Sequence, residues 1–311
     1  ARAPHDFRLR LPATSANLGP GFDAIGLALT LSLEIEATRA EAFSLIASGR
    51  DKDICSSMTD NLLLKTYSQT LTANGVLDPL PLTLEVRNGI PLGMGCGSSA
   101  AARLGGVALA AHFGGLGWDR DRILTEASIL EGHPDNTAAC WLGGFAAATI
   151  ASGRVYAASI KPTVDWRILL ALPRQPLATA RARAVLPSTY SSADAVANVQ
   201  RASLLTAAFA LGRGDLLRVA MQDKMHQPYR DEMCPMLSFL LPLAGEDGSP
   251  GMDGLMGMAL SGAGPAVLLL VESAAHVAEI KRVVDGLTWI PGGRPQVEFI
   301  ECGINNTGAS Y

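Results

Sequence analysis

The segment of this sequence best suited to chemistry is the glycine-rich stretch 88–102, which reads NGIPLGMGCGSSAAA. Glycines allow a backbone to turn sharply and to approach a ligand closely. Strong helix formers follow at once, which places Ser98 and Ser99 in the first turn of an expected helix. The first amides of a helix have no internal partner and, with the helix dipole, attract anions. The stretch therefore predicts a phosphate site whose serine hydroxyls can bond a phosphate oxygen or Mg²⁺, and the plainer alternative is a flexible turn capped by serine.

Two further polar segments combine residue types that bind ligands. A loop is expected at 12–29, where Asn17 and Asp23 lie beside a Pro-Gly turn, and it fits either local turn capping or a binding loop. The hexapeptide EGHPDN at 131–136 ends a predicted helix and lies between apolar segments. Burying such polar side chains is costly unless they have partners or a ligand, so the segment indicates a site. The alternative is a polar turn between two helices.

Alternating and helical patterns predict the elements that would hold these segments. Strands are expected at 7–11, 31–37, 81–87, 166–173 and 296–302, and the segment 43–47 is expected to pair with 31–37. Helices are expected at 61–75, from 98 onward, at 119–130, within 192–223 and at 274–287. A strand, a glycine turn and a second strand are expected at 257–271. The pattern changes near residue 150, which suggests a domain boundary there.

Composition narrows the class of protein. The 311 residues are 48% hydrophobic and 17% charged, which predicts a sizeable buried core. The net charge is −4 without a run of lysines or arginines, which argues against a nucleic-acid surface. The apolar runs are too short or too interrupted to span a membrane, and the N-terminal segment lacks the apolar core of a signal peptide. Five scattered cysteines fit reduced thiols in a cytoplasmic protein better than disulfides or a zinc site.

The glycine-rich stretch resembles the phosphate loop of the GHMP kinases, P-x-x-x-G-x-G-S-S-A, which here runs from Pro91 to Ala100. Cys96 stands where that family usually carries leucine. Residues 12–23, PATSANLGPGFD, resemble without interruption the N-terminal signature of the homoserine kinases within that family. Further similarities to the same group follow in order at 131–136, 179–187, 223–230 and 261–265. Together these segments extend the resemblance over nearly the whole chain.

The resemblance implies an α+β fold of two domains. Residues 1–155 would form an N-terminal ATP-binding domain similar to the second domain of ribosomal protein S5. Residues 156–311 would form a ferredoxin-like C-terminal domain, with ATP and substrate between the two. Relatives are commonly dimers, so a homodimer is expected.

The activity implied by the resemblance is ATP-dependent phosphorylation of the L-homoserine hydroxyl, which gives O-phospho-L-homoserine on the route to threonine. ATP and Mg²⁺ are the implied cofactors, and L-homoserine and ATP are the implied small-molecule partners. Nucleotide contacts are expected from Asn61, Lys65, Pro91, Gly93, Gly95, Gly97, Ser98 and Ser99, although Asn61 also fits a helix cap.

Substrate and catalytic roles are implied for residues of the other matching segments. Substrate contacts are expected from Asn17, Asp23, Asp135, Thr179, Arg183, Arg230 and Gly262. A guanidinium can grip a carboxylate in a bidentate fork, which suits the two arginines to the carboxylate of homoserine. Catalytic roles are expected for Asp135, Asn136, Ser99 and Arg183.

The sequence leaves open which glutamate binds Mg²⁺ and whether a side chain acts as the catalytic base. Mg²⁺ is expected on Ser99 and on either Glu126, nine positions before Asp135, or Glu131 within EGHPDN. Side chains five positions apart on a helix point about 140° away from a common side, so one helical face does not present both glutamates. Asp135 is the candidate base, and the alternative is direct attack of the hydroxyl without a strong base.

Two other functions compete with this interpretation. One is another small-molecule GHMP kinase, such as a mevalonate-pathway enzyme, whose substrate lacks an amino group and would not need the Asn17–Asp23 loop together with EGHPDN. The other is a catalytically silent member that senses a ligand. The intact glycine loop, Ser99 and both glutamates argue against the silent member, because a sensor can lose them.

Overall fold

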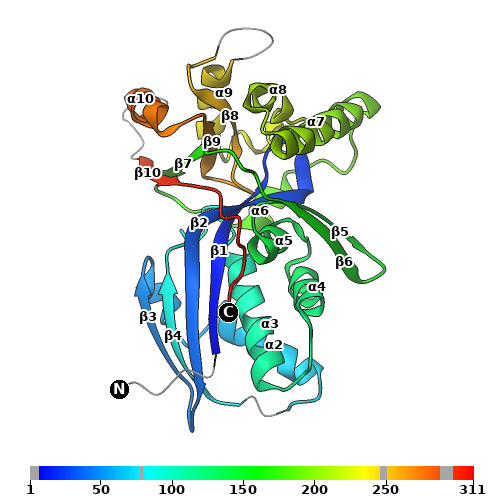
Figure 1. The fold of residues 1–311 in the computed structure, drawn as a ribbon, viewed down its shortest axis with the longest axis vertical. Coiled ribbons are helices and arrows are strands. Elements are labelled where there is room, and N and C mark those ends of the chain that lie inside the picture. Colours follow the sequence, from blue (N-terminus) through cyan, green and yellow to red (C-terminus); the bar gives the residue numbers. More distant parts are fainter. Residues whose placement is uncertain (1–6, 78–79, 246–250, 288–296) are drawn as a thin grey trace.

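A computed structural model describes residues 7–77, 80–245, 251–287 and 297–311 of the chain. These residues form a six-stranded and a four-stranded sheet, each packed against helices, and the expected α+β class is confirmed. In Figure 1 the six-stranded sheet and helices α2 to α5 occupy the lower part of the view, and helices α7 to α10 lie above them. Among the described helices, none combines the length and the apolar character that crossing a membrane requires.

The six-stranded sheet contains the N-terminal strands. Its members are β1 (Phe7–Asn17), β2 (Gly21–Arg39), β3 (Ser44–Gly49), β4 (Leu82–Asn88), β5 (Phe145–Ala151) and β6 (Arg154–Ile160). The order is β3-β4-β2-β5-β6, and β1 also pairs with β2. The predicted pairing of 43–47 with 31–37 is wrong, because β3 lies parallel to β4, which in turn pairs with β2.

The loop predicted at 12–29 is also wrong, because most of it belongs to the long antiparallel strands β1 and β2. The polar residues Thr14, Ser15 and Asn17 are buried in the sheet, and Thr14 Oγ1 donates a hydrogen bond to Asn136 Oδ1 over 2.7 Å. The turn itself is confined to three residues, 18–20. Asn17 and Asp23 adopt positive φ angles of 69° and 55° on either side of it, which bends the chain at the edge of the sheet.

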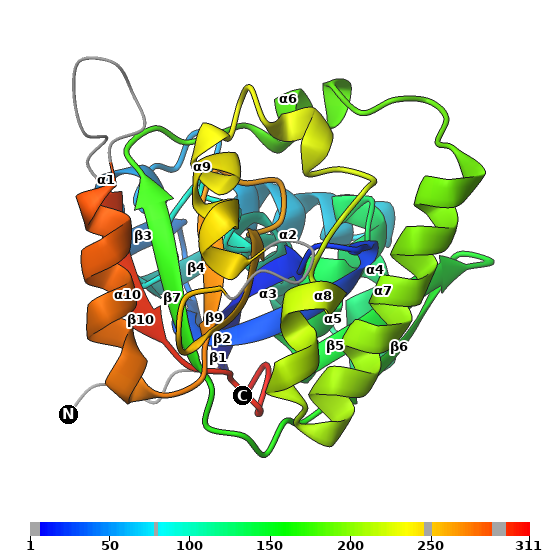
Figure 2. The same ribbon diagram turned by 90° about the horizontal axis from the view of Figure 1, so that it is seen from above.

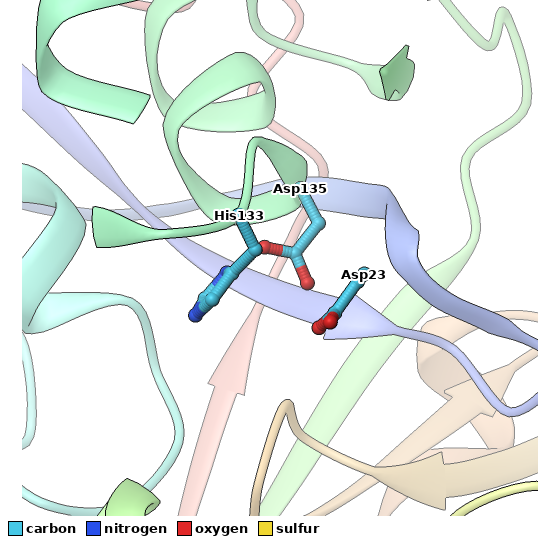
Figure 3. Close-up of side chains that lie close together, drawn as sticks. All are labelled: Asp23, His133 and Asp135. Atoms are coloured by element: carbon cyan, nitrogen blue, oxygen red, sulfur yellow. The ribbon is translucent and has the colours of Figure 1, made fainter. Parts of the chain in front are cut away.

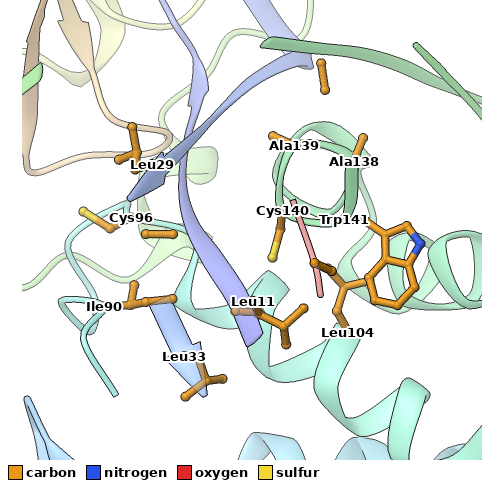
Figure 4. Packing of buried hydrophobic residues seen from close by; sticks show 14 of the residues in the cluster. Leu11, Leu29, Leu33, Ile90, Cys96, Leu104, Ala138, Ala139, Cys140 and Trp141 are labelled. Atoms are coloured by element: carbon orange, nitrogen blue, oxygen red, sulfur yellow. The ribbon is translucent and has the colours of Figure 1, made fainter. Parts of the chain in front are cut away.

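Helices cover one face of the six-stranded sheet. They are α2 (Leu62–Ala73), α3 (Ser98–Phe113), α4 (Arg120–Glu131) and α5 (Asp135–Leu142), while the short α1 (Lys52–Cys55) follows β3. Figure 4 shows Leu11 of β1 beside Leu104 of α3 and Trp141 of α5. Burial of these side chains away from water stabilises the helices on the sheet by about 1.5–3 kcal/mol for each large aliphatic or aromatic group.

The four-stranded sheet is antiparallel throughout. Its strands are β7 (Arg167–Pro173), β8 (Leu255–Leu260), β9 (Val267–Val271) and β10 (Val297–Cys302), in the order β10-β7-β9-β8. Residue 296 of the predicted last strand lies outside the described residues. The helical elements here are α6 (Thr179–Ala184), α7 (Ser192–Leu211), η1 (Gly214–Leu216), α8 (Leu217–Ala220), η2 (Pro228–Arg230), α9 (Pro235–Ala244) and α10 (Ala274–Gly286). Figure 2 shows α7 and α8 on the opposite side of this part of the molecule from α10.

The segment 303–311 crosses from the second sheet back to the first. Ile304 and Ser310 form single β-bridges with Leu29 and Arg10. At the end of the segment, the guanidinium of Arg120 lies over the rings of Trp141 and Tyr311. The last strand of the first sheet, β6, ends at residue 160, and the first strand of the second sheet, β7, begins at residue 167. The domain division between residues 155 and 156 stays a prediction.

Two glycines inside α3 allow that helix to approach α2 closely. A Cβ on Gly106 would lie 2.6 Å from Cβ of Thr66 and 2.7 Å from the carbonyl oxygen of Leu63. These neighbours include backbone, which does not move aside easily. Glycine is a poor helix former, so its presence here reflects the packing of α2 on α3.

We therefore expect Gly106→Ala to lower the free energy of unfolding by about 1–3 kcal/mol because of overpacking. This loss should appear even though alanine is the better helix former by about 1 kcal/mol. The measurement is urea denaturation followed by circular dichroism. Gly286→Ala in α10 is the matched control, because nothing lies within 4 Å of its added Cβ. Equal or higher stability of Gly106→Ala would contradict the packing argument.

Candidate active site

A cavity of about 260 Å³ lies where segments of both sheets meet. The lining includes Asn17, Asp23, Gly93, Gly95, Gly97, Ser98, Ser99, Glu131, Asp135, Asn136, Thr179, Arg183, Arg230 and Gly262. All of these were predicted from sequence, and they come from positions more than 240 residues apart. The cavity therefore brings the predicted segments into one place.

The glycine-rich stretch forms a tight loop that leads into α3. Gly93, Gly95 and Gly97 have φ angles of 67°, 77° and 74°, which side chains rarely allow. A Cβ on Gly95 would lie 1.9 Å from the carbonyl oxygen of Ser261, and one on Gly97 would lie 1.9 Å from Oγ1 of Thr14. Gly97 is the N-cap of α3 and offers no side chain to the first amides of that helix. These amides are therefore suited to binding an anion.

Ser99 and Glu131 meet at the edge of this loop. Ser99 Oγ donates a hydrogen bond to Oε2 of Glu131 over 2.8 Å, and Nε of Arg103 donates to the same oxygen over 2.6 Å. Arg103, whose role the sequence did not explain, is thus the ionic partner of Glu131. Glu126 is paired instead with Arg122 at 2.5 Å on α4 and does not line the cavity.

Asp135 starts α5 and is almost completely buried. Its Oδ1 accepts hydrogen bonds from Nδ1 of His133 over 2.6 Å and from the backbone amide of Asn136 over 2.7 Å. Figure 3 shows that Asp135 projects from the turn that carries His133 toward Asp23 on the neighbouring strand. Each of these three side chains offers one atom that could bind a metal ion, and these atoms lie within 4.8 Å of one another.

His133 is held next to a carboxylate in a largely enclosed position. Burial by itself lowers the pKa of His133, but the hydrogen bond and the negative charge of Asp135 outweigh burial and leave that pKa raised above its ordinary value. The imidazolium form therefore persists to higher pH than in an exposed histidine. The sequence placed His133 inside the EGHPDN motif but gave no separate sign of this pairing.

Asp23 and Arg183 form a bidentate ion pair across the cavity. Nη1 and Nη2 of Arg183 donate to the two carboxylate oxygens of Asp23 over 2.9 and 2.5 Å. Asn17 supports this arrangement, since its Oδ1 accepts from the Asp23 amide over 3.0 Å. Nδ2 of Asn17 donates to the carbonyl oxygen of Gly262 over 3.0 Å and so joins the two halves of the site. One opposite-charge pair thus spans the cavity before any ligand is bound.

Arg230 is a buried cation that lacks a carboxylate hydrogen-bond partner among the described residues. Its guanidinium donates to the carbonyl oxygens of Ala182 and Gly262 over 3.1 and 3.2 Å and lies 3.0 Å from Nδ1 of His226. Burial and the nearby Arg183 both lower the pKa of Arg230, whose guanidinium remains charged at neutral pH. A buried charge of this kind is stabilised by an anion.

Phe22 lies between the two arginines and was missed by sequence reasoning. The guanidinium carbons of Arg183 and Arg230 lie 5.5 and 5.7 Å from the centre of its ring. These are distances at which cation–π attraction operates. The only sequence signal was its position one residue before Asp23 in the matched N-terminal segment. The Phe22 ring is thus a common neighbour of both guanidinium groups.

A second cavity of about 260 Å³ adjoins the first at the start of α3, and Ser98 and Ser99 line both. Its other walls are mostly apolar and include Leu33 and Val86. Asn61 lines this cavity and also caps α2, since its Oδ1 accepts from the Leu64 amide over 3.3 Å.

Three of the predicted site residues line neither of these two cavities. Lys65 is paired with Asp60 at 2.5 Å on the surface, and its side chain is about half exposed. Pro91 lies at the start of the glycine loop without reaching either cavity, and Glu126 points to Arg122. The structure therefore groups most of the predicted residues and separates these three from the rest.

Comparison with known proteins adds an independent view. Residues 61–144 match the family described as GHMP kinases N terminal domain. The chain is 46% identical over 267 residues to a homoserine kinase of Solibacter usitatus, covering 86% of this chain and 85% of that protein. It is 37% identical over 280 residues to a homoserine kinase of Desulfitobacterium hafniense, covering 90% and 92%. The fold matches the crystal structure of homoserine kinase from Cytophaga hutchinsonii with a TM-score of 0.78 at 22% identity, covering 100% of this chain and 98% of that one.

Proposed function

Because this chain belongs to the homoserine kinases of the GHMP kinase family, we infer that its central cavity is where the hydroxyl of L-homoserine is phosphorylated by ATP. The products are ADP and O-phospho-L-homoserine, and the reaction belongs to threonine biosynthesis. The observation that carries the assignment of the site is the uncapped start of α3, which lies between a polar cavity and an apolar one.

We propose that the β- and γ-phosphates of ATP bind the first amides of α3 together with Gly93, Gly95, Gly97, Ser98 and Ser99. Three glycines with positive φ angles allow the backbone to come close to the phosphates. The adenosine part then occupies the adjoining apolar cavity, where Asn61 supplies a polar edge. Lys65 and Pro91, which line neither cavity, have no part in this proposal.

The oxygen atoms of Ser99 and Glu131 fit a magnesium ion. They lie 2.8 Å apart beside the proposed phosphate site, and hydroxyl and carboxylate oxygens are the ligands that Mg²⁺ prefers. When bound, Mg²⁺ neutralises negative charge on the phosphates of ATP. Arg103 balances the charge of Glu131 in the protein alone and competes for the same oxygen. We therefore propose Glu131, not Glu126, as the metal glutamate.

The Asp23–Arg183 pair suits an amino acid as the acceptor. A zwitterion brings a carboxylate for Arg183 and Arg230 and an ammonium group for Asp23 and Asn17, so neither member of the ion pair loses its counter-charge. An acid without an amino group, such as mevalonate, would draw Arg183 away and leave Asp23 unpaired, which is costly in a partly enclosed site. Thr179 and Gly262, which also line the cavity, complete the proposed substrate contacts.

Asp135 is placed to receive the acceptor hydroxyl. Its Oδ1 is held by His133 and by the Asn136 amide, and Figure 3 shows the carboxylate facing Asp23, the proposed ammonium partner. Thr14 fixes the side chain of Asn136 beside it. In the proposed step the hydroxyl oxygen attacks the γ-phosphorus, the bond to the bridging oxygen breaks, ADP leaves and the proton passes to Asp135. Positioning and charge neutralisation supply most of the rate enhancement in such reactions.

We also propose that the protein acts as a homodimer in the cytoplasm. This part rests on the resemblance to relatives that are commonly dimers and on the scattered unpaired cysteines. The described cysteines are all free thiols, and burial raises the pKa of the Cys96 thiol to about 12, which keeps it unreactive beside the phosphate loop.

The direct test of the proposed function is ADP release with ATP and Mg²⁺, comparing L-homoserine with mevalonate, galactose and no acceptor. We expect strong stimulation by L-homoserine alone, because only this acceptor satisfies both Asp23 and Arg183. Stimulation by mevalonate or galactose instead would discard the carboxylate and ammonium assignments. ATP binding without turnover for any acceptor would indicate a ligand sensor.

The metal assignment is tested by Glu131→Gln against Glu126→Gln. Each variant loses one carboxylate–arginine pair, so the two are matched in what they remove from the surface of α4. We expect Glu131→Gln to raise the Mg²⁺ concentration for half-maximal turnover by at least about tenfold, while Glu126→Gln stays near the parent protein. The reverse order would transfer the metal role to Glu126.

Asp135→Asn tests the role of the proposed base. Loss of a general base lowers kcat by about 10²- to 10⁴-fold, and we expect a loss in this range. Asp121→Asn on the exposed side of α4 makes the same chemical change away from the cavity and serves as the control. Turnover that persists while KM for L-homoserine rises would show that Asp135 binds the substrate without abstracting a proton.

A further inference from the structure

A third cavity, of about 470 Å³, lies among α7, α8, α9 and the segment 223–231. It is separate from the two cavities of the proposed active site and shares no lining residue with them. Its volume falls within the range of pockets that hold small molecules, about 300–1,000 Å³. Three cations line it, namely Arg201 of α7, Arg218 of α8 and Lys224.

Among the described lining residues, the charges of this cavity are unbalanced toward the positive. Two acidic residues, Asp223 and Asp231, also line it. The carboxylate of Asp223 is fully buried and already accepts hydrogen bonds from Asn198 Nδ2 and from the amides of residues 225, 226 and 227, over 2.7 to 3.0 Å. The Asp223 carboxylate is therefore held in place by these hydrogen bonds, and the described lining carries three cations against two carboxylates.

Arg201 supplies a second, independent sign of a ligand. Its Nη1 atom is buried and has no hydrogen-bond partner in the described part of the chain. An unpaired donor of this kind is destabilising when it is removed from water, and a ligand oxygen that accepts its hydrogen bond would offset that cost. Arg218 uses one of its nitrogens to donate to the carbonyl oxygen of Leu255 over 2.9 Å, so its guanidinium is held in place at the wall.

From this cavity we propose that the protein has a second ligand site, for a small metabolite carrying a carboxylate or phosphate group, that controls the affinity of the active site for its amino acid. Guanidinium groups bind both kinds of oxyanion in bidentate fashion, and Lys224 adds a mobile point charge at the rim. The chemistry shared by the candidate ligands is thus a small oxyanion with one or two negative charges.

The segment between Asp223 and Arg230 connects this site to the active site. Asp223 and Gln227 line the third cavity, whereas Arg230, one turn further on, lines the active-site cavity. His226 lies between them, with Nε2 2.7 Å from the carbonyl oxygen of Gly19 and Nδ1 3.0 Å from Arg230. A shift of this segment toward a ligand in the third cavity therefore moves the guanidinium proposed to hold the substrate carboxylate.

Helix α7 provides a parallel connection. Asn198 lies one helical turn before Arg201 and bridges Asp223 Oδ1 and the carbonyl oxygen of Pro20 over 2.8 and 3.4 Å. Pro20 belongs to the turn that leads to Phe22 and Asp23. Gln227 adds a third link, because its Oε1 accepts from the amide of Leu260, which precedes the turn at 261–265. Both substrate-facing turns are thus tied to walls of the third cavity.

Binding is tested first, on the whole protein and without reference to activity. Inorganic phosphate and succinate are titrated at constant ionic strength set with sodium chloride, and the melting temperature is recorded. A ligand that binds only the folded protein raises that temperature in a saturable manner. We expect saturation with at least one of the two anions and its loss in Arg201→Met and in Lys224→Met. Lys224 is exposed, so its replacement leaves the fold intact even if that of Arg201 does not.

The outcomes distinguish a carboxylate ligand from a phosphorylated one, and binding in the third cavity from binding at the start of α3. Stronger binding of succinate assigns a carboxylate metabolite, and stronger binding of phosphate assigns a phosphorylated one. Arg154→Met on β6, a residue that lines none of the three cavities, is the matched control and should bind as the parent protein does. Stabilisation that is unchanged in Arg201→Met and Lys224→Met would place the anion at the start of α3 and overturn the proposal, as would the absence of saturable binding.

The control of the active site, which rests on the proposed function, is tested by kinetics at saturating ATP. We expect the bound anion to change KM for L-homoserine at least about fivefold with little change in kcat, and Arg201→Met to abolish that change. Saturable binding with an unchanged KM would overturn the regulatory role. If L-homoserine is not phosphorylated at all, the proposed function fails while the binding measurement still decides whether the second site exists.

Discussion

The whole site depends on a close backbone contact between the two sheets. The glycine loop before α3 and the turn after β8 approach until a Cβ on Gly95 would overlap the carbonyl oxygen of Ser261. The Ser261 hydroxyl donates back to the Gly95 carbonyl over 2.8 Å, and Asn17 bridges from β1 to Gly262. Since each of these contacts involves a backbone atom, they fix the glycine loop relative to the proposed substrate residues with little freedom. The sequence positions that allow this contact are glycines for a steric reason.

Each carboxylate at the centre of the site already has a basic side chain as its partner in the protein alone. Asp23 is paired with Arg183, Glu131 with Arg103 and Asp135 with His133. A carboxylate enclosed in this way is stabilised by the basic group beside it. A charged group of a ligand in the proposed reaction therefore replaces a partner that a charged side chain of the site already has. Such exchange favours ligands whose charges match in both sign and number, which is the physical basis of the proposed preference for a zwitterion.

Sequence reasoning predicted the fold class and most of the cavity lining, because glycine spacing and the polar hexapeptide 131–136 have specific physical meanings. It failed where polar residues are satisfied by partners far along the chain. Thr14 and Asn17 fit a loop by residue type, yet their hydrogen-bond partners are residues 136 and 262. Thr14 lies within the buried strand β1, and Asn17 is the last residue of that strand. The choice between Glu126 and Glu131 needed the direction of α4 relative to Ser99. Phe22, His133 and Arg103 acquire meaning only through neighbours that no local pattern reveals.

The returning segment 303–311 has a consequence for how the protein is made. It adds bridges to β1 and β2, and the ring of Tyr311 makes edge-on contacts with the rings of Phe7 in β1 and Trp141 in α5. A ribosome synthesises the chain from β1 onward, so the sheet that appears first cannot be finished until the last of these residues has emerged. During that interval the edges of β1 and Trp141 lack part of their cover. The first sheet to be synthesised is therefore completed only by the segment that is synthesised last among the described residues.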